Sequence, residues 1–213
     1  MKSIAVSKNV QIYRKLCEEI VHGIRNPGEL LSEKELCTLF QVSKTPVRQA
    51  LNELIKDGLV ETIPQKGFFV TEVRLVDVLE IYRLREVLDQ LAVEASILEN
   101  RTDTLEAMRY ILKEQELTIE TGDYPKYLDL DMEFHKAYWP VCQNKRLKSY
   151  LGRLMNDSIR FSRLSNNDFV RAKLSIVQHK AILEAYEKGD INAAKKAVQA
   201  HMAGIREYFK NKL

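Results

Sequence analysis

Three of the four histidines in the chain stand where a helical pattern calls for an apolar residue. They are His135, His179 and His201, and aliphatic or aromatic side chains flank each of them at helical spacing. Asp131 precedes His135 by four residues, so both side chains project from one face of a helix. Burial of four uncompensated polar groups would cost several kcal/mol, and we therefore expect these residues to share a partner.

A divalent transition metal is the partner that this set of side chains suits best. Three imidazoles and one carboxylate match Zn²⁺ or Ni²⁺, and the nitrogen content makes Mn²⁺ less favoured. Two alternatives stay open. The cluster could bind an organic anion directly, and a single inward histidine is often no more than a hydrogen-bonded core residue.

A second group of polar residues gathers at the start of a helix predicted from Ser43 to Gly58. Lys44 and Arg48 bring positive charge to a helix N-terminus, where the helix dipole disfavours it, so an outside anion such as phosphate is indicated. Ser43 or Thr45 can cap this helix, and Pro46 fits its first turn. A solvated helix start is the alternative. The opposite face carries the buried stripe Val47, Leu51, Leu54 and Ile55.

The elements around this helix predict a winged helix-turn-helix. A helix over residues 10–24 and a short helix from Ser32, which has the S-x-x-E spacing of a capping box, precede it. Residues 59–63 and 68–73 follow as two β-rich runs joined by 64–67. At this tip Lys66 supplies a cation and Gly67 permits close backbone approach. In this architecture the third helix enters the major groove of DNA while the wing contacts the backbone or minor groove.

From Asp77 onward the pattern is entirely helical. Helices are expected over 77–98, 102–120, 123 to about 140, 144–161, 168–188 and from 190 onward. The change of period over 72–76 divides the chain into a DNA-binding domain, 1–74, and an all-helical domain, 75–213. The predicted fold is therefore mainly α, with a winged helix-turn-helix followed by a bundle of six or seven helices.

The composition narrows the class of protein. The formal net charge is only +3 and is spread almost evenly, so DNA binding must depend on the placement of charge. No apolar run approaches the roughly 20 residues of a membrane helix, and no secretory signal is evident, so a cytoplasmic location without membrane contact is expected. Cys17, Cys37 and Cys142 form no C-x-x-C pair, and we expect reduced thiols.

Two stretches carry a family resemblance. The run PGELLSEKELCTLFQVSKTPVRQALNELIKDGLVETIPQKGFFV resembles the DNA-binding domain of GntR-type bacterial regulators. The remainder resembles the ligand-sensing FCD domain of the FadR-like branch. Its landmarks are 82–86, 131–135 and 179–185, followed by Gly189, Asp190, Ala194 and His201.

The resemblance implies a homodimer on a palindromic operator and a metal beside a small carboxylate effector. It places DNA contacts at Lys34, Lys44, Thr45, Arg48, Lys66 and Gly67, and metal ligands at Asp131, His135, His179 and His201. Arg85 matches an arginine that helps to receive an acidic effector, although an interhelical salt bridge with a neighbour such as Asp89 is an equal alternative. The sequence departs from the usual pattern at Lys44, Gln49 and Gln178, and lysine at 44 lacks the bidentate fork of arginine.

These observations together predict a ligand-responsive transcription regulator, with repression as the expected sign. Sugar acids, dicarboxylates and amino acids all suit a pocket made of a metal and an arginine. The alternatives are a DNA-binding protein with a purely structural metal and a metalloenzyme fused to a DNA-binding domain. We do not expect an enzyme, because no separate general base accompanies the ligands as it does in an H-E-x-x-H motif.

Overall fold

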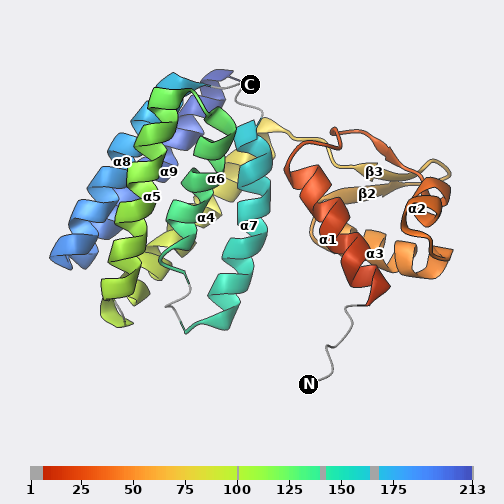
Figure 1. Ribbon diagram of the computed structural model, residues 1–213, viewed down its shortest axis with the longest axis horizontal. Helices are drawn as coiled ribbons and strands as arrows, with labels where there is room; N and C mark the ends of the chain where they lie inside the picture. The colour runs from red at the N-terminus through yellow and green to blue at the C-terminus, as the bar shows by residue number, and fades with distance from the viewer. Residues whose placement is uncertain (1–6, 100, 140–142, 164–167, 213) are drawn as a thin grey trace. The chain divides into compact units, whose positions relative to one another are not determined.

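The computed structural model describes residues 7–99, 101–139, 143–163 and 168–212. The chain divides into two compact units, Met1–Val73 and Arg74–Leu213, each with its own core. The ribbon in Figure 1 follows the elements of each unit in chain order. Cys17 and Cys37 are half-buried and form no disulfide among the described residues, whereas Cys142 lies outside the described residues.

The helices of the first unit are α1 (Lys8–Val21), α2 (Glu33–Phe40) and α3 (Lys44–Lys56). α1 and α2 both pack on α3. Leu16 and Ile20 of α1 are fully buried, as are Leu51 and Leu54 of α3, because each pair recurs at helical spacing on one face. The apolar stripe predicted for α3 therefore forms the centre of this core.

The strands of the first unit form a small antiparallel sheet in the order β1-β3-β2. β2 (Val60–Ile63) and β3 (Gly67–Val70) make the predicted hairpin, with Val60 opposite Val70. At its turn Gln65 and Gly67 adopt positive φ angles of 63° and 115°, and Gly67 does so without steric cost. β1 (Leu30–Leu31) pairs with β3 and was not predicted, because two residues carry no alternating pattern.

The starts of α2 and α3 differ in their capping. Ser32 caps α2 as predicted, and its hydroxyl accepts from the backbone N–H of Glu35 at 3.4 Å. Ser43 occupies the N-cap position of α3, but its side chain makes no capping hydrogen bond, and Thr45 lies inside the helix. The expected cap at Ser43 or Thr45 is therefore not formed, and Ser43 is exposed.

The described residues of the second unit form six helices, within the predicted number. They are α4 (Leu75–Glu99), α5 (Arg101–Thr121), α6 (Tyr124–Lys136), α7 (Lys145–Arg163), α8 (Phe169–Lys188) and α9 (Ile191–Lys212). α9 packs on both α4 and α8, while α5 packs on α6 and α8, as Figure 1 illustrates. Among the described residues, no helix is long and apolar enough to cross a membrane.

Candidate functional site

Three helices of the second unit bring the predicted histidines together. His135 of α6, His179 of α8 and His201 of α9 each offer a ring nitrogen, and these nitrogens lie within 4.8 Å of one another. The Nε2 atoms of His135 and His201 are 3.1 Å apart. All three side chains are almost completely buried. Asp131, one turn before His135, places Oδ1 3.7 Å from Nε2 of His179.

An outer layer of hydrogen bonds fixes the proton on each imidazole. Nδ1 of His179 lies 3.0 Å from Oε1 of Gln115, and Nδ1 of His201 lies 3.0 Å from Oε1 of Gln178. A side-chain carbonyl oxygen can only accept, so both Nδ1 atoms donate. The sequence prediction did not assign a role to either glutamine.

The third histidine is fixed through a tyrosine. Nδ1 of His135 lies 3.0 Å from the hydroxyl of Tyr138, and that hydroxyl donates to Oδ1 of Asp89 at 3.0 Å. Since a carboxylate only accepts, the single proton of Tyr138 goes to Asp89 and Nδ1 of His135 must donate. Trp139 also donates to Asp89, at 2.9 Å.

The three Nε2 atoms therefore carry lone pairs that face a common point. Burial lowers the pKa of His135 and His201 well below the usual value, and it lowers the pKa of His179 to about 3; nearby arginines act in the same direction. The imidazoles are thus neutral near pH 7. Two facing lone pairs at 3.1 Å repel, and no described residue offers Nε2 of His179 a hydrogen bond. A cation at this point would resolve both features, so the donor set fits a divalent transition metal.

Asp131 connects the histidines to a cavity. Its Oδ1 accepts from the hydroxyl of Tyr127 at 3.0 Å. Burial raises the pKa of Asp131, although the Tyr127 hydrogen bond and the charges of Arg171 and Arg85 act in the opposite direction. A buried carboxylate without a full countercharge is costly, which again favours a cation beside it.

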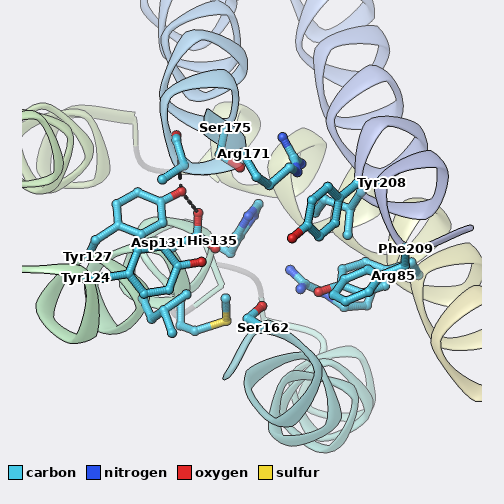
Figure 2. Close-up of a pocket in the computed structure, with 15 residues that line it drawn as sticks. Arg85, Tyr124, Tyr127, Asp131, His135, Ser162, Arg171, Ser175, Tyr208 and Phe209 are labelled. Atoms are coloured by element: carbon cyan, nitrogen blue, oxygen red, sulfur yellow. Dashed lines mark hydrogen bonds between the residues drawn. The ribbon is translucent and has the colours of Figure 1, made fainter. Parts of the chain in front are cut away.

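The cavity holds about 440 Å³, including its open mouth. Asp131 and His135 line one part of it, so the histidine cluster borders this space directly. Figure 2 shows Tyr124 and Tyr127 on one side of the cavity and Tyr208 and Phe209 on the other. Aromatic walls with a few charged groups are typical of a small-molecule site.

Arg85 lines this cavity from α4 and is fully buried. Its Nε donates to Oδ2 of Asp89 at 3.1 Å and its Nη1 to Ser158 at 3.1 Å. The pair with Asp89 lies within one helix, so the interhelical bridge considered above is wrong in that detail. Nη2 lies 3.0 Å from Oδ2 of Asp89, yet its alignment gives it no hydrogen bond within the described residues. Arg85 therefore pairs with Asp89, while its role in receiving an effector stays a prediction.

Arg171 of α8 is a second cavity arginine that the sequence prediction missed. Its Nη1 makes a long contact of 3.4 Å to Gln178, and its guanidinium lies 6.0 Å from the centre of the Tyr208 ring. Its buried Nη2 has no hydrogen bond among the described residues. A signal was present, because Arg171, Ser175 and His179 follow one another at four-residue spacing on one helix face.

The predicted DNA contacts lie in the first unit, and most are exposed. Six of them are exposed and Gly67 is half-buried; the exposed residues are Lys34, Ser43, Lys44, Thr45, Arg48 and Lys66. Lys34 lies on α2, which packs on α3. Within the described part of the chain, Arg48 forms an ion pair with Glu33, whereas Lys34, Lys44 and Lys66 form none.

Two known protein families match consecutive parts of the chain. Residues 8–70 match the family described as "Bacterial regulatory proteins, gntR family". Residues 80–204 match the FCD domain, which includes all four candidate metal ligands and Arg85. The two matches together cover most of the chain.

Known relatives extend over nearly the full length. The HTH-type transcriptional regulator YdhC of Bacillus subtilis is 35% identical, over 96% of this chain and 92% of its own. The HTH-type transcriptional repressor RspR of Escherichia coli is 29% identical, over 93% of this chain and 87% of its own. The solved structure of E. coli McbR/YncC has a TM-score of 0.80 at 21% identity, over 97% and 99% of the two chains, and shows the fold. The relatives named here are transcriptional regulators and not enzymes.

Proposed function

Because the chain belongs to the GntR family of transcriptional regulators, in the FadR-like branch with an FCD domain, we propose that it is a repressor relieved by a small organic acid. It binds a palindromic operator as a homodimer, in the cytoplasm where bacterial DNA lies. Residues 1–74 bind the DNA, and residues 75–213 bind metal and effector and hold the dimer together. Two copies of α3 then enter neighbouring major grooves about 34 Å apart.

The exposure of the basic residues around α3 supports the DNA-binding part of the proposal. Arg48 reads a base edge, while Lys34, Lys44 and Lys66 contact phosphates. The unfilled cap at Ser43 leaves its hydroxyl available to a phosphate, and Thr45 lies in the same first turn. Gly67 lets the wing backbone approach the duplex.

The metal part of the proposal rests on one observation, the three Nε2 lone pairs that converge beside Asp131. These four side chains would hold Zn²⁺ or Ni²⁺. When bound, the metal supplies a positive centre to which an oxygen of the effector can coordinate. The outer partners Gln115, Gln178 and Tyr138 keep the imidazoles in the tautomer that binds metal.

The charges around the cavity support an acidic effector. Asp89 offsets the charge of Arg85, and Asp131 offsets only part of a divalent cation. No described acidic side chain forms a salt bridge with Arg171, so the cavity keeps a net positive charge once metal is bound. A small carboxylate compensates this charge, and the tyrosine hydroxyls suit an effector that also carries hydroxyl groups.

A purely structural metal is the second candidate, because all three imidazoles are buried. The position of Asp131 and His135 on the cavity wall argues against it, since a bound molecule could reach the metal from that side. For regulation, the effector must bind the DNA-incompetent state more tightly than the competent state. A tenfold change in operator affinity requires a difference of only about 1.4 kcal/mol.

Three measurements test the proposal. Elemental analysis after purification without a histidine tag, together with thermal shifts in Zn²⁺ and Ni²⁺, tests the metal; protein that neither contains nor responds to metal would exclude it. A thermal-shift screen of organic acids on the metal-loaded protein, followed by operator binding with the best acid, tests the effector. Insensitivity of operator binding to every acid that binds would favour the structural metal.

The DNA face is tested by replacing Arg48 with alanine. Because a good base contact is worth roughly 1–3 kcal/mol, the variant should bind a selected operator about 5- to 150-fold more weakly, with its fold and dimer unchanged. Arg14→Ala removes another exposed arginine, from α1, and should bind as the wild type does. If Arg48→Ala bound the operator as tightly as Arg14→Ala and the wild type do, the assignment of α3 as the reading helix would be contradicted.

A further inference from the structure

The side chain of Arg48 is held in place by an acid from another helix. Its Nε lies 2.8 Å from Oε2 and 3.0 Å from Oε1 of Glu33, the first residue of α2. The Arg48 side chain is 61% exposed and the Glu33 side chain is 19% exposed. The two residues are 15 positions apart in the chain, so the contact depends on the packing of α2 against α3.

The atoms used in this contact leave the outer edge of the guanidinium available. Arginine has five N–H donors, and the ion pair at Glu33 occupies the Nε–H. The Nη1 and Nη2 groups together form the fork that can donate to O6 and N7 of guanine. A carboxylate on Nε therefore fixes the direction of the side chain while it spares the pair of donors needed for bidentate recognition.

An acid at this position needs an explanation, because it lies on a surface proposed to meet phosphate. A negative charge near a phosphate backbone weakens non-specific binding. An exposed ion pair also adds little to folding stability. The advantage must come from pre-organisation: an arginine already held in one rotamer loses less conformational freedom when it binds a base.

We propose that Glu33 is a specificity-determining positioning residue, which holds Arg48 through Nε so that its Nη fork addresses a guanine edge. The inference rests on the proposed role of Arg48 in DNA binding and assigns a further residue to it. Glu33 itself touches no base. It raises the affinity for the correct sequence and lowers the affinity for all others.

The experiment uses the full-length protein and two labelled duplexes of equal length. One is selected from a random-sequence pool by the wild-type protein, and the other is a scrambled version of it. Fluorescence anisotropy at one fixed salt concentration gives the ratio of the two affinities. Glu33→Gln should lower this ratio about tenfold, because a misplaced fork loses most of its discrimination between bases. Its affinity for the scrambled duplex should stay equal or rise.

Three further variants separate geometry from charge. Glu35→Gln removes the same charge from the first turn of α2, where Glu35 is exposed, and should leave the ratio within about twofold of wild type. Glu33→Asp keeps the charge but is one methylene shorter, so it should lose the ratio as Glu33→Gln does. In Glu33→Gln combined with Arg48→Ala, the ratio should be no lower than in Arg48→Ala alone. Circular dichroism and melting curves check that each variant is folded.

Each outcome bears on one claim. An unchanged ratio of affinities in Glu33→Gln or in Glu33→Asp would overturn the positioning role. An equal rise in affinity for both duplexes would also overturn it, because that is the result expected if Glu33 only repels the DNA phosphates. A wild-type ratio in Arg48→Ala would instead refute the proposed DNA contact itself. A loss in Glu35→Gln equal to that in Glu33→Gln would trace the effect to helix charge and not to the contact.

Discussion

Replacing Gln115 with leucine removes the carbonyl oxygen that lies 3.0 Å from Nδ1 of His179. The substitution nearly conserves volume, and Gln115 is completely buried, so the surrounding helices need little adjustment. Without its acceptor, His179 can move its proton from Nδ1 to Nε2, where the proton would occupy the position of a metal ion. The variant should therefore fold normally and bind metal poorly.

The substitution affects two quantities, the stability of the metal-free protein and its affinity for metal. The buried Nδ1–H of His179 loses its partner, which costs about 1–3 kcal/mol, but the amide nitrogen of Gln115, which has no partner among the described residues, is removed at a similar gain. The metal-free stability should change little. Loss of an outer hydrogen bond weakens metal affinity about 10- to 100-fold. At a metal concentration that stabilises the wild type by about 2.7 kcal/mol, a tenfold loss leaves about 1.4 kcal/mol.

Two assays separate these effects. Chemical unfolding of the metal-free proteins should give closely similar free energies for wild type and Gln115→Leu, while Zn²⁺ titration against a competing chelator should give clearly different affinities. Gln199→Leu, an exposed glutamine of α9, controls for the substitution itself. Wild-type metal affinity in Gln115→Leu would refute the reasoning that Gln115 sets the tautomer of His179.

Two other predictions follow from residues that border the second unit's core. A Cβ on Gly204 would lie 2.7 Å from Nε2 of Gln178, so Gly204→Ala should displace Gln178 from His201. The variant should lower metal affinity about tenfold or more in the same titration. As a control, Gly152→Ala, whose Cβ meets nothing within 4 Å, should leave metal binding intact and stabilise α7 by up to about 1 kcal/mol. Asp168 caps α8, and the hydrogen bond from the backbone N–H of Arg171 is the main cause that lowers the pKa of the Asp168 carboxyl. The ionised carboxylate therefore stabilises the fold above the unfolded pKa of about 3.9, and this stabilisation is lost as the pH falls through the folded pKa. Asp168→Asn keeps a capping oxygen but does not ionise, so the variant should melt at a lower temperature than the wild type near pH 7, and this difference should shrink below about pH 4. A difference that stays constant with pH would contradict the stabilising role of the Asp168 charge.

Much of the fold could be predicted from the sequence, because its elements have clear periods. The stripe in α3, the cap at Ser32 and the switch to a helical pattern after residue 76 all depend on neighbours within a few positions. β1 could not be predicted in this way, since Leu30–Leu31 becomes a strand only by pairing with Phe68 and Phe69. The capping residue of α3 was also misjudged, because a serine at the right position does not determine its side-chain rotamer.

The residues of the candidate site also differ in whether the sequence alone could identify them. Asp131 and His135 could be paired from their spacing, and an inward histidine is visible as a polar residue in an apolar stripe. Gln115 and Tyr138 could not be assigned, because their roles arise only where one helix or turn meets another. Arg171 lay within reach, because Arg171, Ser175 and His179 follow four-residue spacing along one helix. The pairing of Arg85 with Asp89 was expected, and its four-residue spacing could have placed it within one helix.

The histidine cluster also bears on the local unfolding of the second unit. His135 and His201 are 66 residues apart in the chain, yet their ring nitrogens are in contact. A metal held there joins α6, α8 and α9 as a cross-link does, so none of these helices can separate from the others without releasing the ion. Backbone amides of all three should then exchange with solvent as one cooperative group in the loaded protein, while α1, α2 and α3 keep the exchange rates of the metal-free form.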